Sequence, residues 1–146
     1  MHVALGCDHR GLGLKQAISG ILKEMGHESK DFGCYNASSV DYPDIARDVA
    51  KAVTSGQFAQ GILICGTGIG MSMAANKVKG IRAALCGDAI SGSKARQHND
   101  ANILCLGADI IGEELTLDIV RAYLATDFEN GRHSRRLEKV HALETN

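Results

Sequence analysis

The sequence predicts an α/β fold, a three-layer αβα sandwich around a parallel sheet of five strands. Short apolar segments of strand length alternate with longer amphipathic segments of helix length along the whole chain. Glycine stands at many of the boundaries between them. The central apolar run, residues 62–64, is continuous and not alternating, which is typical of a strand buried on both faces.

The first half of the chain is expected to contain three strands and two helices. Residues 12–25 carry apolar side chains at helical spacing, and Gly26 ends that helix. The second helix begins at Pro43, which suits a first helical position, and Gly56 ends it. The strands are expected at residues 3–7, 28–32 and 62–64.

The second half repeats this alternation. A short helix is expected at 71–75, directly after a glycine-rich loop. Residues 98–102 should form a turn between a helix and the fifth strand, and Met71 and Met73 are most simply core residues. The remaining strands are expected at 81–86 and 103–106, and the remaining helices at 89–97, at 113–124 and as a short helix opening within 130–137.

Composition limits the class of protein. The 146 residues suit a single domain, 1–146, and a net charge of −1 gives no general attraction to nucleic acid or anionic membranes. No apolar run approaches the ~18 residues of a spanning helix, and the N-terminus lacks the pattern of a signal peptide. The five cysteines include no Cys-x-x-Cys pair, which argues against a zinc site or a disulfide framework. We therefore expect a cytoplasmic protein with reduced thiols.

The segment Cys65-Gly66-Thr67-Gly68-Ile69-Gly70 is the strongest candidate for a functional site. It joins the central strand to a helix, and in open α/β sheets ligands bind at the carboxyl ends of strands. Glycines allow the backbone to approach a ligand closely, and the free N–H groups of a helix start favour an anion. The anion could be a phosphate or an oxyanion formed during a reaction. The same position favours ionisation of the Cys65 thiol.

Other interpretations of this loop are weaker. The chain has no Walker A motif, and Met71 replaces the third glycine of a dinucleotide-binding fingerprint, although Asp88 follows about 20 residues further on. An isolated cysteine at a strand end is more often a small core residue. The glycines that follow Cys65 favour a functional thiol instead.

Further polar residues follow other strands and helices. Asp8, His9 and Asp88 come after strands one and four, so we expect them to converge with Cys65 at one sheet edge, although Asp8-His9 could be a simple turn. His98 and Asn99, taken alone, would face water. Arg132 and Arg136 are spaced to share a helix face, as either a phosphate clamp or a solvated basic surface.

Taken together, the motifs resemble those of the type B ribose 5-phosphate isomerases, in the family that also holds the galactose 6-phosphate isomerase subunits. The likeness covers nearly the whole chain and implies a five-stranded Rossmann-like fold that works without metal or organic cofactor. It also implies active sites between the two chains of a homodimer, often paired into tetramers, with the C-terminal helix contributing to the dimer. The motifs are Gly6-Cys7-Asp8-His9, Asp41-Tyr42-Pro43, Ile64-Cys65-Gly66-Thr67-Gly68-Ile69-Gly70, Ala74-Ala75-Asn76-Lys77, Gly80-Ile81-Arg82-Ala83, Arg96-Gln97-His98-Asn99-Asp100-Ala101-Asn102 and Gly131-Arg132-His133.

The resemblance also implies a reaction, the interconversion of D-ribose 5-phosphate and D-ribulose 5-phosphate. Cys65 would move a proton between C2 and C1 of the sugar, and Thr67 would help to transfer the hydroxyl proton. Asp8 and His98 would open the furanose ring, with His98 supplied by the partner chain. An enediolate needs such a base together with fixed hydrogen-bond donors, which the loop amides offer.

The remaining positions would bind the substrate. The loop amides that hold the enediolate would be those of Gly66, Gly68, Ile69 and Gly70. His9 would bind the phosphate together with Arg132 and Arg136 of the partner chain. Tyr42 and Asn99 would line the sugar site.

Two departures from the family pattern affect the substrate. Met71 occupies the place of a glutamate base found in some members, which leaves Cys65 as the base. Asp109 stands where many relatives carry a phosphate-binding arginine, so allose 6-phosphate, galactose 6-phosphate or another aldose phosphate remains an alternative substrate. A non-catalytic flavodoxin-like module that binds a phosphate ligand is a rival of another class. A thiol redox protein is disfavoured because no resolving cysteine lies nearby.

Overall fold

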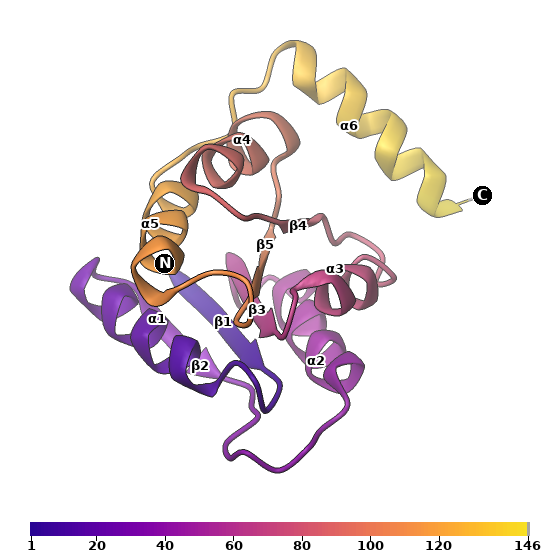
Figure 1. Ribbon diagram of the computed structural model, residues 1–146. Helices are drawn as coiled ribbons and strands as arrows, with labels where there is room; N and C mark the ends of the chain where they lie inside the picture. Colours follow the sequence, from indigo (N-terminus) through magenta and orange to yellow (C-terminus); the bar gives the residue numbers. More distant parts are fainter. Residues whose placement is uncertain (146) are drawn as a thin grey trace.

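The computed structural model describes residues 1–145 and contains one parallel five-stranded sheet with the order β2-β1-β3-β5-β4 (Figure 1). This confirms the predicted α/β class and the Rossmann-like sheet. All residues of β3 are buried, as expected for the central strand. The strands are β1 (His2–Cys7), β2 (Glu28–Asp31), β3 (Gln60–Cys65), β4 (Ala83–Leu85) and β5 (Ile103–Gly107).

Helices cover both faces of the sheet. In Figure 1, α1 and α5 lie on one side and α2 and α3 on the other, whereas α6 extends away from the sheet towards the C-terminus. Helix α4 packs mainly against α5. The helices are α1 (Leu12–Glu24), α2 (Tyr42–Thr54), α3 (Ile69–Ala75), α4 (Ala89–Asn99), α5 (Glu113–Leu124) and α6 (Arg132–Ala142), followed by a 3₁₀ turn at Leu143–Thr145.

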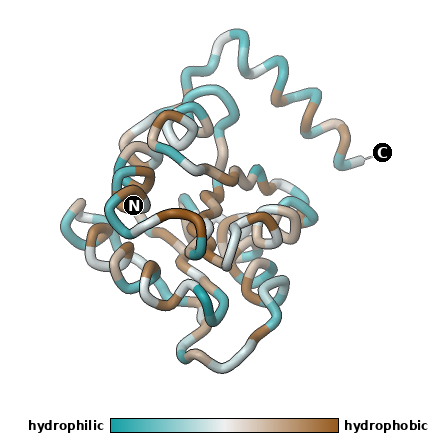
Figure 2. Tube along the Cα trace, viewed as in Figure 1, coloured by the Kyte–Doolittle hydropathy of each residue, from teal (hydrophilic) through white to brown (hydrophobic). Residues whose placement is uncertain are grey.

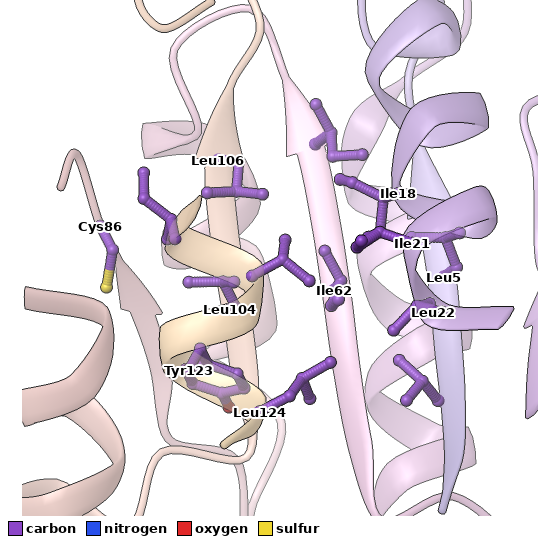
Figure 3. Close-up of a cluster of buried hydrophobic side chains, with 14 of the residues drawn as sticks. Leu5, Ile18, Ile21, Leu22, Ile62, Cys86, Leu104, Leu106, Tyr123 and Leu124 are labelled. Carbon is purple, nitrogen blue, oxygen red and sulfur yellow. The ribbon is translucent and has the colours of Figure 1, made fainter. Parts of the chain in front are cut away.

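Two apolar clusters, one on each face, hold the layers together. Figure 3 shows one of them, where Ile18 and Leu22 of α1 and Tyr123 of α5 meet Ile62 and Leu104 of the sheet. Burial of each such large side chain contributes about 1.5–3 kcal/mol. In Figure 2 the brown segments gather inside the sandwich, while α6 is largely hydrophilic. None of the helices in residues 1–145 is both long and apolar enough to cross a membrane.

The structure corrects three local expectations. The predicted strand 81–86 shortens to β4, an edge strand in which the side-chain amide of Asn76 bonds the backbone N–H and carbonyl of Ala83. Helix α4 runs on to Asn99, so residues 98 and 99 lie in its last turn and not in the following loop. It ends at Asp100, which adopts a left-handed conformation without being a glycine. Met73 is 63% exposed and is not a core residue.

A buried hydroxyl offers a test of the core. The Tyr123 hydroxyl donates to the carbonyl oxygen of Ala101 at 2.7 Å, and Gln60 lies 2.6 Å from the same hydroxyl, with its amide nitrogen facing the tyrosine oxygen in the better-satisfied orientation. Tyr123→Phe keeps the ring but removes both bonds, so we expect the free energy of unfolding to fall by about 1–3 kcal/mol. Urea denaturation should show a lower midpoint with an unchanged slope. Tyr35→Phe, at a residue 72% exposed, should change little, and equal losses in the two variants would contradict this assignment.

Candidate active site

The glycine-rich loop places a sulfur atom beside backbone N–H groups. Strand β3 ends at Cys65, and Gly68, with φ of 78°, turns the chain into α3. Because only glycine adopts this φ without strain, the turn depends on Gly68. The Gly68 N–H donates to the Cys65 sulfur at 3.2 Å, and the Ile69 N–H donates to the Thr67 hydroxyl at 3.2 Å. The loop therefore directs a backbone N–H at the sulfur of Cys65.

Cys65 lines a cavity of about 420 Å³. Cys65 is only 5% exposed, and its inner side packs in the apolar cluster beneath α2 and α3. The cavity is lined by Asp8, Tyr42, Cys65, Gly66, Thr67, Ile69 and Gly70.

The loop after β5 is joined to the glycine-rich loop by backbone hydrogen bonds. Backbone N–H groups of Ala108 and Asp109 donate to the carbonyl oxygens of Cys65 and Gly66, each at 2.9 Å. A Cβ atom on Gly107 would lie 2.6 Å from the carbonyl oxygen of Thr67, so only glycine permits this close approach. This role of Gly107 is not predicted from the sequence, where its only signal is a glycine at the end of a strand.

Asp8 and Tyr42 form the other walls of the cavity. One carboxylate oxygen of the buried Asp8 accepts the backbone N–H of Arg10 at 2.9 Å, and the second oxygen has no hydrogen bond within residues 1–145. The ring of Tyr42 rests on Gly70, where a Cβ would lie 2.6 Å from a ring carbon. Asp8, directly after β1, and Tyr42, at the start of α2, thus line the same cavity as Cys65.

His9 lies just outside this cavity. Its Nδ1 accepts the backbone N–H of Val40 at 3.4 Å, which leaves Nε2 as the nitrogen that carries the proton in the neutral ring. This half-buried imidazole can therefore present an N–H donor beside Asp8.

A second group of predicted site residues gathers where α4 meets α6. The ring of His98 stacks on the ring of His133 with centroids 4.4 Å apart. The Glu129 carboxylate lies 3.5 Å from His133 Nε2 and 4.0 Å from His98 Nε2. Arg132 and Arg136 are in the first turns of α6. None of these residues, nor Asn99, lines the Cys65 cavity of the same chain.

The predicted convergence of Asp88 with Cys65 is wrong. Asp88 caps the start of α4, where its carboxylate accepts the Ser91 N–H at 2.7 Å. It does not line the cavity. The reason is topological, because β4 is the edge strand and β5 separates it from β3.

Three potential metal ligands, His98, Glu129 and His133, lie within 4.8 Å of one another. The two imidazole planes are only 16° from parallel, so their in-plane lone pairs run side by side and do not converge on one ion. The arrangement therefore does not fit a metal centre, and the buried His133 Nε2 has no hydrogen bond within residues 1–145. Neither Glu129 nor His133 is predicted as a site residue from the sequence, although His133 belongs to the Gly131-Arg132-His133 motif.

The groups around His98 determine the direction in which its pKa is shifted. Desolvation, together with His133 and Lys94, lowers the pKa of His98, whereas Glu129 raises it. Removing the carboxylate in Glu129→Gln should lower this pKa further, and removing the cation in Lys94→Gln should raise it. Titration of the imidazole protons by NMR measures both shifts, with His27 as an internal reference. Shifts of the same sign in both variants would contradict this electrostatic assignment.

Comparison with known proteins shows the family of the chain. Residues 3–140 match the family model described as Ribose/Galactose Isomerase. The chain is 47% identical over 142 residues to Ribose-5-phosphate isomerase B of Escherichia coli, an alignment that covers 97% of this chain and 95% of that protein.

Solved structures give the same result. The ribose 5-phosphate isomerase B of Clostridium thermocellum superposes with a TM-score of 0.98 at 49% identity, covering 99% of this chain and 98% of the other. The Mycoplasma genitalium enzyme, solved with bound ribulose 5-phosphate, superposes with a TM-score of 0.94 at 42% identity, covering 99% and 97%. The chain therefore belongs to the ribose/galactose isomerase family and is an isomerase.

Proposed function

We propose that the protein interconverts D-ribose 5-phosphate and D-ribulose 5-phosphate through a cysteine-based proton transfer. The observation that carries this proposal is the Cys65 sulfur, which lines a cavity and accepts an N–H from the glycine-rich loop. Aldose–ketose isomerisation needs a base beside the substrate carbon and donors aimed at the developing oxyanion. The relatives named for ribose 5-phosphate support the choice of sugar.

The reaction begins with opening of the furanose ring, for which Asp8 and His98 would move the proton between the anomeric hydroxyl and the ring oxygen. The Cys65 thiolate then removes the proton from C2 of the aldehyde, giving the thiol and an enediolate. The loop amides hold the enediolate charge, and Thr67 helps to move a proton between the oxygens at C1 and C2. The thiol returns its proton to C1, so the ketose forms and the thiolate is regenerated.

The substrate would lie between two chains. The separation of His98, Asn99 and the α6 arginines from the Cys65 cavity of their own chain supports a homodimer with shared sites. In this arrangement His9 binds the phosphate from the Cys65 side, while Arg132 and Arg136 of the partner chain bind it from the other. Asn99 of the partner chain would complete the sugar site opposite Tyr42.

Incubation with ribose 5-phosphate, followed by detection of ketopentose, tests the reaction directly. Running it in heavy water should introduce deuterium into the sugar, because the proton on sulfur can exchange with solvent before it is returned. Binding of ribose 5-phosphate without turnover would instead support a non-catalytic phosphate-binding module.

A second substrate class deserves the same assay because Asp109 lies beside the cavity wall, against Gly66. Allose 6-phosphate and galactose 6-phosphate are the alternatives, and kcat/KM for the three sugar phosphates ranks them. A higher value for either hexose phosphate would replace ribose 5-phosphate in the proposal while leaving the chemistry at Cys65 unchanged.

A further inference from the structure

The residues that line the cavity beside Cys65 include no cation that could bind the phosphate of a ligand. Of these residues, only Asp8 carries a charged side chain, and that charge is negative. Binding a sugar phosphate there requires cations from outside this lining. The arginines of α6 do not reach the cavity of their own chain.

Arg10 supplies a cation at the rim. Its Nε donates to Asp109 Oδ2 at 2.6 Å, joining the loop after β1 to the loop after β5. The pair rests on Gly66, because a Cβ built on Gly66 would lie 2.9 Å from Asp109 Oδ2 and 3.3 Å from Arg10 Cδ. Since Gly66 lines the cavity, this ion pair lies against one of its lining residues, at the rim.

The geometry of the pair leaves the arginine able to bind an anion. Asp109 takes Nε, and neither Nη atom of Arg10 has a hydrogen bond within residues 1–145. The Arg10 side chain is 56% exposed, so its Nη groups are accessible. Two terminal N–H groups in one plane match the oxygens of a phosphate. Asp109 therefore neither stands alone nor simply repels phosphate; it holds the guanidinium over the rim.

We propose that Arg10 is a phosphate-binding residue supplied by the same chain as Cys65, and that Asp109 is its positioning residue. The inference rests on the proposed function, since the ligand is the phosphate of the sugar substrate. It makes this ion pair a determinant of specificity for phosphorylated over free sugars.

Arg10→Gln should raise KM for ribose 5-phosphate roughly 10- to 100-fold with little change in kcat, as expected for one lost charge-assisted contact. Turnover of free D-ribose at high concentration should not change. Asp109→Asn should give a smaller increase in KM, because the arginine remains but is no longer held. Arg47→Gln is the matched control, since Arg47 is also half exposed and paired with two carboxylates, yet lies on α2 away from the cavity lining.

A variant in which the two charged residues are exchanged tests whether phosphate binding depends on where the guanidinium lies. In Arg10→Asp/Asp109→Arg the guanidinium remains over Gly66, so the double variant should recover a large part of the affinity that Arg10→Asp alone loses. Failure of this recovery in a folded double variant would overturn the positioning role. Equal effects of Arg10→Gln on ribose and ribose 5-phosphate, or no effect on either, would overturn the phosphate-binding role.

Binding of inorganic phosphate, measured by calorimetry, keeps this inference distinct from the proposed function. If the protein turns over no aldose phosphate, the proposed function fails, yet weaker phosphate binding in Arg10→Gln would still support the role of Arg10. If turnover is normal and Arg10→Gln binds phosphate as the unmodified protein does, the inference alone fails.

Discussion

Cys65→Ala should abolish measurable isomerisation, with kcat falling roughly 10²- to 10⁴-fold or more while ribose 5-phosphate still binds. The expectation follows from the position of the sulfur, which is the group that lines the cavity and accepts the Gly68 N–H. Alanine removes the proposed base but leaves the loop amides and the cavity walls in place. The loss should therefore appear in kcat and not in the dissociation constant.

Cys105→Ala is the matched control. This thiol lies in the same apolar cluster, but it is fully buried on β5, and burial raises the pKa of Cys105 far above its ordinary value. It should contribute packing but no chemistry, so kcat should remain close to that of the unmodified protein at a temperature where the variant is folded. Full activity in Cys65→Ala, or an equal loss in both variants, would remove the thiol from the mechanism.

Mixing two inactive variants should restore activity if the sites are shared. A dimer of one Cys65→Ala chain and one His98→Asn chain contains one site in which both residues are intact. Random reassortment makes about half of the dimers mixed, each with one working site, so roughly a quarter of the unmodified activity should return. Co-expression with two affinity tags isolates the mixed dimers for assay.

The control pair is Cys65→Ala with Asp8→Asn. Both residues line the cavity of one chain, so each site of the mixed dimer carries one defect and activity should stay low. Recovery in the control pair, or none in the Cys65/His98 pair despite isolated mixed dimers, would show that His98 does not act across the interface.

The parts of the site that are local in sequence could be predicted from it. A buried strand, a thiol and three alternating glycines specify the loop at Cys65 within a few residues, and the structure confirms that geometry. The convergence of Asp8 with Cys65 could also be predicted, because parallel strands end at one edge, whereas Tyr42 is implied only by the resemblance of Asp41-Tyr42-Pro43 to the family motif.

Other features depend on contacts that no local pattern reveals. The position of Asp88 away from Cys65 could not be predicted, because the order of the strands in the sheet, and not their order in the chain, decides which strand ends are neighbours. His98 and Asn99 fell within α4 because Asp100, a non-glycine residue, ends the helix in a left-handed conformation. The Arg10–Asp109 pair joins residues 99 positions apart, and only the folded chain brings them together.

The attachment of the glycine-rich loop to the segment after β5 is made through main-chain atoms at residues 108 and 109. The side chain at position 109 takes no part in those bonds, so a substitution there leaves the main-chain hydrogen bonds to Cys65 and Gly66 in place. A change of side chain at position 109 can thus alter the charge at the rim of the cavity while the main-chain support of Cys65 stays the same.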